Sequence, residues 1–386
     1  MLGKIALLFA LTLSLTNENN AQVAASMDGL ELVLPGERFK ISLGEHQLLN
    51  DGGDLGLEYF PDQTTVVLSN EPGLRILTAA TDSTFLLAGK DWKSLSSARK
   101  VLAPVADSVY DNGYAGIAGV FRTRAGRLYG IYHAEDHRDI PRFASGVPGY
   151  YASVAMAYSD DSAETWRRLG PVITSSKGKS WQKYPGQADR GAGEPSLVID
   201  KRAKWIYVYY TEHSRISSTG VHIGMARAST RIAQGSTPRF YKLRDGEFDQ
   251  PGIGGLDSPI ITLPEPSMSE ALIPHVVFLR GLDTYFMTLS VNYWGDYLTD
   301  RGLTNSGIYL SISKDGVSWN DPQLLFQDYT VPLTGRTFSW GATLVADNEN
   351  AESGWLVYGH SSRWGGSAIG GTPHHLVGRR FQIPRN

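Results

Sequence analysis

The feature that most constrains this chain is a hairpin pattern that occurs five times. Each time, a run of β-branched, apolar or aromatic residues reaches a short turn and is followed by a second such run, which predicts a β-hairpin. The pairs recur at intervals of roughly 50 to 80 residues, a spacing typical of a β-propeller. We therefore expect an all-β fold, a five-bladed β-propeller of four-stranded antiparallel blades. The pairs begin near Thr65, Ala115, Ser196, His275 and Ala342.

The blade boundaries follow from these pairs and from the Gly-, Pro-, Asp- and Ser-rich segments between them. Residues 30–49 precede the first blade, and we expect them to lie against the propeller edge or to supply a closing strand. Residues 175–193 and 245–259 are too long for simple hairpins, and long loops in compact folds tend to be functional. The blades are predicted at residues 58–101, 111–173, 193–243, 271–326 and 338–383.

Composition restricts the class of protein. The 386 residues are 41% hydrophobic and can bury a large core, and all-β folds of this length often form one domain. A net charge of -3 argues against a nucleic-acid partner. The absence of Cys excludes disulfides and thiolate metal sites. We expect one catalytic β-propeller domain over residues 26–386, monomeric and without a membrane span.

The N-terminus has the pattern of a signal peptide. Lys4 supplies a positive charge, residues 5–15 are apolar, and small residues follow at 21–26. The apolar run is too short to span a bilayer. We therefore predict a signal peptide at residues 1–25 and a mature protein that is secreted or periplasmic.

Two turn segments are close to the Asp-box pattern Ser-x-Asp-x-Gly-x-Thr-Trp. Residues 158–166 have Ala163 where the pattern has Gly, and residues 313–319 are one residue shorter. In such a turn, Asp accepts hydrogen bonds from backbone N–H groups and Trp packs beneath it. We predict structural turns, without a catalytic role, between the third and fourth strands of a blade.

The strand order of an antiparallel blade gathers the candidate chemistry on one rim of the propeller. The first strand starts on the rim where the second strand ends, and the turn between them lies on the opposite rim. Carboxylate, imidazole and aromatic side chains concentrate at these starts and ends, whereas residues 123–126 and 200–203 read as ordinary solvated turns. The first rim is therefore the predicted site.

Clustered carboxyl groups and aromatic residues are what glycoside hydrolysis requires. One carboxylic acid protonates the leaving oxygen, and a second carboxylate activates water or attacks the sugar. Repulsion and partial burial separate the two pKa values. The candidate catalytic residues are Glu194, Asp111, Glu135 and Asp136. Because side chains alternate along a strand, we expect only one of Glu135 and Asp136 to reach the pocket.

The candidate substrate-binding residues come from the same rim and its loops, where aromatic faces could bind the C–H surfaces of sugars. His133 and His137 are four residues apart, which would align them on a helix, but the segment is predicted as strand and loop, and we assign no metal. The candidates are Tyr114, His133, His137, Arg190, Glu212, His213, His275, Trp294, Arg336 and Trp340.

The third blade carries a family resemblance. Residues 194–199 read Glu-Pro-Ser-Leu-Val-Ile, and residues 205–211 read Trp-Ile-Tyr-Val-Tyr-Tyr-Thr. This resembles the five-bladed propeller glycoside hydrolases of the arabinanase and β-xylosidase type. The resemblance implies that Glu194 is the general acid and that Asp111 is the base or the group that tunes the acid. In that family an Asp on the first blade is the base; here that blade opens with Glu58 and Asp62, and neither is assigned.

The resemblance also admits a structural Ca²⁺ in the channel, without any other cofactor, and a carbohydrate substrate. We therefore expect a secreted glycoside hydrolase that cleaves a poly- or oligosaccharide with two carboxylates in the central pocket. A sialidase-like exo-glycosidase is an alternative, since Asp boxes are frequent in sialidase-like propellers, although the sialidase Arg triad cannot be placed. A non-catalytic carbohydrate-binding propeller is a further alternative. The polar rim disfavours a protein-interaction scaffold.

Overall fold

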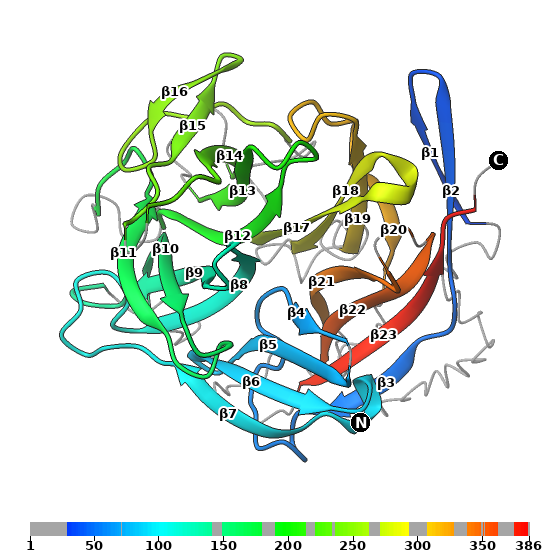
Figure 1. The fold of residues 1–386 in the computed structure, drawn as a ribbon, viewed down its shortest axis with the longest axis horizontal. Helices are drawn as coiled ribbons and strands as arrows, with labels where there is room; N and C mark the ends of the chain where they lie inside the picture. The colour runs from blue at the N-terminus through cyan, green and yellow to red at the C-terminus, as the bar shows by residue number, and fades with distance from the viewer. Residues whose placement is uncertain are drawn as a thin grey trace, which may run out of the picture.

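The computed structural model describes residues 29–70, 72–140, 149–179, 190–213, 221–233, 236–261, 271–292, 307–327, 338–348, 350, 352–361 and 374–384. Within these residues the chain forms β-strands and two short 3₁₀ turns, η1 (Trp92–Ser94) and η2 (Arg280–Leu282). Five antiparallel sheets surround a common centre (Figure 1). The expected all-β, five-bladed propeller is confirmed. No helix in the described ranges has the length and apolar character needed to cross a bilayer. The predicted signal peptide lies outside the described residues.

Three blades are simple four-stranded meanders in which consecutive strands are neighbours. The first blade consists of β4 (Val66–Ser69), β5 (Leu74–Ala80), β6 (Ser83–Gly89) and β7 (Ser96–Leu102). The second consists of β8 (Tyr114–Arg122), β9 (Leu128–Asp136), β10 (Tyr151–Ser159) and β11 (Arg167–Ile173). The fourth consists of β17 (Ala271–Leu279), β18 (Thr284–Asn292), β19 (Gly307–Ser313) and β20 (Gln323–Phe326).

The other two sheets carry additional strands. The third blade has a fifth, outer strand and consists of β12 (Ala192–Ile199), β13 (Trp205–Glu212), β14 (His222–Ser229), β15 (Tyr241–Arg244) and β16 (Glu247–Pro251). The fifth blade joins β21 (Phe338–Ala346), β22 (Ser353–Ser361) and β23 (His375–Gln382) to three N-terminal strands, β1 (Leu30–Leu34), β2 (Glu37–Leu43) and β3 (Gln47–Asp51).

The N-terminal strands close the ring. Both β2 and β3 pair antiparallel with the C-terminal strand β23, through Ser42 opposite Gln382 and Asp51 opposite His375. The first and last parts of the chain therefore share one sheet, and the expectation that residues 30–49 supply a closing strand is confirmed.

The hydrophobic core is divided among the seams between neighbouring blades. One cluster, for example, joins Leu77 and Leu86 of the first blade to Ile117 and Tyr132 of the second. Similar clusters fill the seams between the second and third, third and fourth, fourth and fifth, and fifth and first blades. Because each sheet is covered on both faces, its strands are rich in continuous apolar runs, which is why the hairpins are visible in the sequence.

The register of the inner hairpins confirms the shared rim. Tyr114 at the start of β8 lies opposite Glu135 near the end of β9, and Ala192 at the start of β12 lies opposite Glu212 at the end of β13. We call this rim the upper rim. The hairpin turns of the inner strands lie on the other side, the lower rim.

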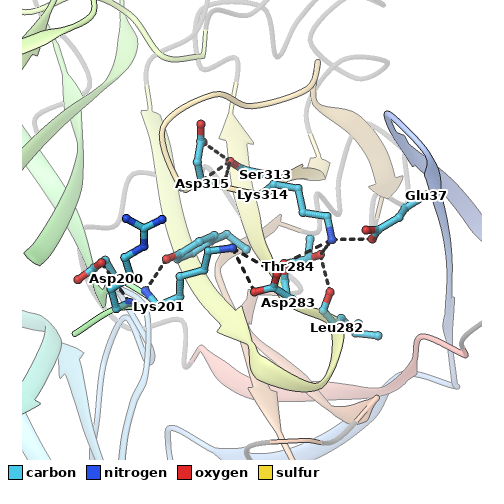
Figure 2. A network of polar contacts seen from close by, with 12 residues as sticks. Glu37, Asp200, Lys201, Leu282, Asp283, Thr284, Ser313, Lys314 and Asp315 are labelled. Carbon is cyan, nitrogen blue, oxygen red and sulfur yellow. Dashed lines mark hydrogen bonds and ion pairs between the residues drawn. The ribbon is translucent and has the colours of Figure 1, made fainter. Parts of the chain in front are cut away.

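The lower rim is a network of turn contacts, part of which Figure 2 shows. The backbone N–H of Lys201 donates to the Tyr285 hydroxyl at 2.7 Å, and the Lys201 ammonium lies 3.2 Å from the Asp283 carboxylate. Lys314 Nζ lies 2.5 Å from a carboxylate oxygen of Glu37, which connects the fourth blade to the β1–β2 hairpin (Figure 2). These contacts join neighbouring elements at the lower rim. The predicted site lies on the upper rim.

The two predicted turn segments join third and fourth strands, as expected. Between β10 and β11, an Asp161 oxygen accepts from the backbone N–H of Thr165 at 2.9 Å, and Trp166 is buried. Between β19 and β20, one oxygen of Asp315 accepts from two successive backbone N–H groups at 2.7 and 2.8 Å. In both turns a carboxylate satisfies backbone donors, which is a structural task.

Candidate active site

Three carboxyl groups from three blades act on one another at the upper rim. Asp62 lies in the segment before β4, Glu135 near the end of β9, and Glu194 in β12. The charges of Glu135 and Glu194 both raise the pKa of Asp62, and Glu135 also acts on Glu194. The propeller therefore brings together side chains that are far apart in the sequence.

Glu194 is held in an unusual backbone conformation. Its φ of 42° lies in the left-handed region, and the β12–β13 register shifts between Gly193 and Ser196, as in a bulge. A bulge re-aims a side chain out of the regular pleat. Glu194 is buried, and its Oε2 lies 2.5 Å from Nε2 of His213.

His133 connects Glu194 to Glu135. The backbone N–H of Glu194 donates to Nδ1 of His133 at 2.9 Å, so this nitrogen carries no proton. The ring proton is therefore assigned to Nε2, which lies 2.9 Å from Glu135 Oε1. A ring held from both sides fixes the Glu135 carboxylate relative to the Glu194 backbone.

Glu135 is a well-stabilised anion. Its second oxygen lies 2.6 Å from Nε2 of His137, so each carboxylate oxygen contacts an imidazole. Burial alone would raise the pKa of Glu135, but the hydrogen bonds from His133 and His137 outweigh it and lower the pKa to about 2. Glu135 is therefore ionised at neutral pH.

Glu194 and Asp62 respond to burial in opposite ways. Burial raises the pKa of Glu194, but the adjacent His213 outweighs this effect and the net pKa is lowered. The pKa of Asp62 is raised to about 7, chiefly by burial and further by the charges of Glu135 and Glu194, although the nearby Tyr114 hydroxyl opposes the rise. Near neutral pH, Asp62 therefore holds a proton for part of the time beside two carboxylates.

Tyr150 and Arg190 lie beside the two imidazoles that contact Glu135. Tyr150 packs near His133 and His137, with ring centroids 6.1 and 6.4 Å apart. The Arg190 guanidinium lies 5.8 Å from the centre of the Tyr150 ring. Burial, opposed by the Arg190 charge, raises the pKa of the Tyr150 hydroxyl, and the charges of Glu194 and Glu135 contribute to the rise. Of the predicted substrate contacts, His133, His137, Arg190 and His213 thus belong to this cluster.

Tyr114 belongs to the same cluster. Its ring packs edge-on against His133, with centroids 5.4 Å apart, and its hydroxyl faces Asp62. It occupies the head of the second blade, where the sequence placed it.

The structure gives Asp111 a different environment. Asp111 is fully buried, and its Oδ2 accepts from Nε of Arg168 at 2.7 Å and from the Tyr132 hydroxyl at 3.1 Å. Asp111 is not among the groups that shift the pKa of Asp62, Glu135 or Glu194. Its described side-chain contacts are with Arg168 and Tyr132 of the second blade, not with the carboxyl cluster.

Asp136 also has structural partners. Its two oxygens accept from the Asn112 amide at 2.5 Å and from the Lys179 ammonium at 2.8 Å. Glu135 and Asp136 thus have separate sets of partners, in agreement with the alternation expected for a strand.

Three other predicted contacts have described neighbours other than the three carboxyl groups. Glu212 is buried near Tyr210 and Lys242, on whose pKa values its charge acts. The Nδ1 of His275 accepts from the backbone N–H of Leu344 at 3.3 Å, and burial lowers the pKa of His275 to about 4. Trp340 packs against His374, with ring centroids 4.6 Å apart. The remaining two candidates, Trp294 and Arg336, lie outside the described residues.

Sequence reasoning missed three residues on the upper rim: Asp62, Tyr150 and His374. Asp62 opens the first blade, but no strand pattern surrounds it. Tyr150 and His374 immediately precede β10 and β23, the third strands of their blades. Third strands start on the rim where second strands end. A residue just before a predicted third strand is therefore expected on the upper rim, and this rule would have identified Tyr150 and His374.

The described residues contain no group of three or more His, Cys, Asp or Glu side chains that could hold a metal ion. A separate cavity of about 450 Å³ lies at the lower rim. Asn70, Leu279 and Ala346, at the ends of β4, β17 and β21, contribute to its lining. It is remote from the carboxyl cluster.

Comparisons with known proteins give likeness in fold. No protein-family model matches the chain, and a search of curated proteins also finds no match. Among solved structures, an α-L-arabinofuranosidase from Lactobacillus brevis aligns at 13% identity over 82% of this chain and 91% of its own, with a TM-score of 0.50. Zg3597, a family 117 glycoside hydrolase from Zobellia galactanivorans, aligns at 12% identity over 89% of this chain and 90% of its own, with a TM-score of 0.51. At these identities, the likeness establishes that the chain shares the propeller fold of these proteins.

Proposed function

We propose that this protein is an exported glycoside hydrolase that cleaves a poly- or oligosaccharide at the upper rim of a single propeller domain. The observation that carries the proposal is a carboxyl group with a pKa near neutrality, Asp62, next to two ionised carboxylates, Glu135 and Glu194. Glycoside hydrolysis requires a protonated carboxylic acid and an ionised carboxylate on either side of the scissile bond. Pairs of acids whose environments separate their pKa values indicate the two roles.

The pKa directions assign Asp62 as the proton donor to the leaving oxygen. Glu194 is then the ionised partner that activates water or attacks the sugar. This assignment reverses the role expected for Glu194 from the family resemblance, because His213 stabilises the Glu194 anion. Among the described residues, hydrogen bonds engage both oxygens of Glu135 but only Oε2 of Glu194. We therefore assign the chemistry to Glu194, while Glu135 supplies the charge that keeps the proton on Asp62.

Two further lines support the proposal. The two solved structures compared above are described as an α-L-arabinofuranosidase and a family 117 glycoside hydrolase. The apolar N-terminal run after Lys4 supports export, where polysaccharides are encountered. We further propose that the protein acts as a monomer.

The test is hydrolysis of a glycan panel by the purified protein, with products identified by mass spectrometry. The wild type should release sugars from at least one glycan. Asp62→Asn and Glu194→Gln should each lower kcat by about 10² to 10⁴-fold, the usual contribution of acid–base catalysis. Asp249→Asn, on the exposed outer strand β16, is the matched control and should retain full activity. Full activity of Asp62→Asn and Glu194→Gln would contradict the assignment.

The same panel separates the main alternatives. Binding of a glycan without release of any product would favour a non-catalytic carbohydrate-binding propeller. Cleavage of sialosides but not of pentosides would favour a sialidase-like enzyme.

A further inference from the structure

Tyr59 lies three residues before Asp62 in a strained backbone segment. Its φ is 50°, in the left-handed region that bulky residues rarely occupy. The segment is anchored to the β5–β6 hairpin, because Thr81 N–H donates to the Glu58 carbonyl at 2.8 Å and Asp62 N–H donates to the Ala79 carbonyl at 2.9 Å. Strain of this kind persists only where the surroundings enforce it, and it is concentrated at functional sites.

An aromatic row braces the Tyr59 ring. Tyr59 packs edge-on against His374, with centroids 4.8 Å apart at 86°, and His374 packs edge-on against Trp340, at 4.6 Å and 76°. His374 and Trp340 are buried, whereas Tyr59 remains partly exposed. Burial lowers the pKa of His374 to about 4, so its ring is an uncharged spacer at neutral pH. The row therefore presents one ring, that of Tyr59, to solvent.

The partly exposed Tyr59 ring lies three residues from the proposed proton donor in the chain and is within reach of its charge. Burial raises the pKa of the Tyr59 hydroxyl, and the charge of Asp62 raises it further, which places the two side chains within electrostatic reach of each other. An acid that protonates the leaving oxygen must contact the leaving group. A ring beside that acid is therefore positioned to contact the leaving group as well.

We propose that Tyr59 is the stacking platform for the sugar ring on the leaving-group side of the scissile bond, and that His374 and Trp340 are positioning residues that hold it. The inference rests on the proposed function, in particular on Asp62 as the proton donor. It specifies the substrate class: a glycoside whose leaving group is itself a sugar, cleaved in preference to one with a small alkyl leaving group. An aromatic ring gains contact with the C–H face of a sugar but little with a methyl group.

The experiment compares disaccharides with the matching methyl glycosides, on wild type, Tyr59→Ala, Tyr59→Phe and Tyr241→Ala. Tyr241 is an exposed Tyr on β15 of the third blade and serves as the matched control. Tyr59→Ala should lower kcat/KM for the disaccharide about tenfold, mainly through KM, and leave the methyl glycoside unchanged. Tyr59→Phe keeps the ring and should recover the disaccharide rate that Tyr59→Ala loses, and Tyr241→Ala should behave as wild type. Circular dichroism melting confirms that each variant is folded.

The outcomes distinguish this inference from the proposed function. Equal loss on both substrates, or no loss on the disaccharide, overturns the platform while hydrolysis stands. If the wild type cleaves nothing, the proposed hydrolase fails, and binding to a disaccharide array tests the platform alone. Binding lost in Tyr59→Ala but kept in Tyr59→Phe supports the platform; binding that survives in Tyr59→Ala, or no binding by the wild type, overturns it.

Discussion

At the scale of single residues, the groups that contact a carboxylate decide its role. Glu135 contacts two imidazoles and is ionised, with a pKa of about 2. Asp62 is opposed by two neighbouring anions, and its pKa rises to about 7. Asp111 is fully buried against a guanidinium. Sequence alone presents Glu135 and Asp111 as equivalent acids near strand ends. Only their contacts distinguish a member of the carboxyl cluster from a buried ion pair.

Asp111→Asn tests this distinction. Removing the charge leaves Arg168 and its partly buried guanidinium without an anion, so the variant should lose about 1 to 3 kcal/mol of unfolding free energy. Its kcat per folded molecule should remain that of the wild type, because the described side-chain partners of Asp111 are Arg168 and Tyr132 and not the carboxyl cluster. Urea unfolding and the active-site-normalised rate provide the two readings. A fall in kcat by orders of magnitude with unchanged stability would restore Asp111 as a catalytic group.

At the scale of strands and turns, the strands of each blade run alternately between the upper and the lower rim. This alternation explains which site residues could be predicted from the sequence. The upper rim receives first-strand starts, second-strand ends and third-strand starts, and the hairpin pattern places all of these. His133 and His213 could be placed in this way because they follow strong apolar runs. Tyr59 and Asp62 could not, because their position depends on hydrogen bonds to the distant β5–β6 hairpin. The partner of Asp111, Arg168, likewise comes from a strand 57 residues away.

The closing strands provide a prediction at this scale. On β1, Leu32 is fully buried in the seam of the fourth and fifth blades, whereas its neighbour Val33 is 52% exposed. Leu32→Ala should cost about 2 to 5 kcal/mol through lost burial and the cavity that remains. Val33→Ala, the control on the same strand, should change stability by less than about 0.5 kcal/mol. Equal effects of the two substitutions in urea unfolding would show that β1 does not pack into this seam.

At the scale of the whole molecule, ring closure produces the site. Asp62, Glu135 and Glu194 belong to three blades and meet because the blades surround one centre (Figure 1). The number of blades and their strand pattern could be predicted from the sequence, since every seam imposes paired apolar runs. The assignment of acid and base could not, because it depends on the electrostatic field that three blades create together.

The measurement that tests this account most directly is the titration of Asp62 itself. Infrared difference spectra between the wild type and Asp62→Asn, recorded from about pH 2.5 to 9, follow the protonated carboxyl band. The account predicts that the band disappears as the pH rises through about 7, and that Glu135→Gln lowers this midpoint because one neighbouring anion is removed. A midpoint near the ordinary aspartate value of 3.8, unaffected by Glu135→Gln, would show that the carboxyl groups of the blades do not meet.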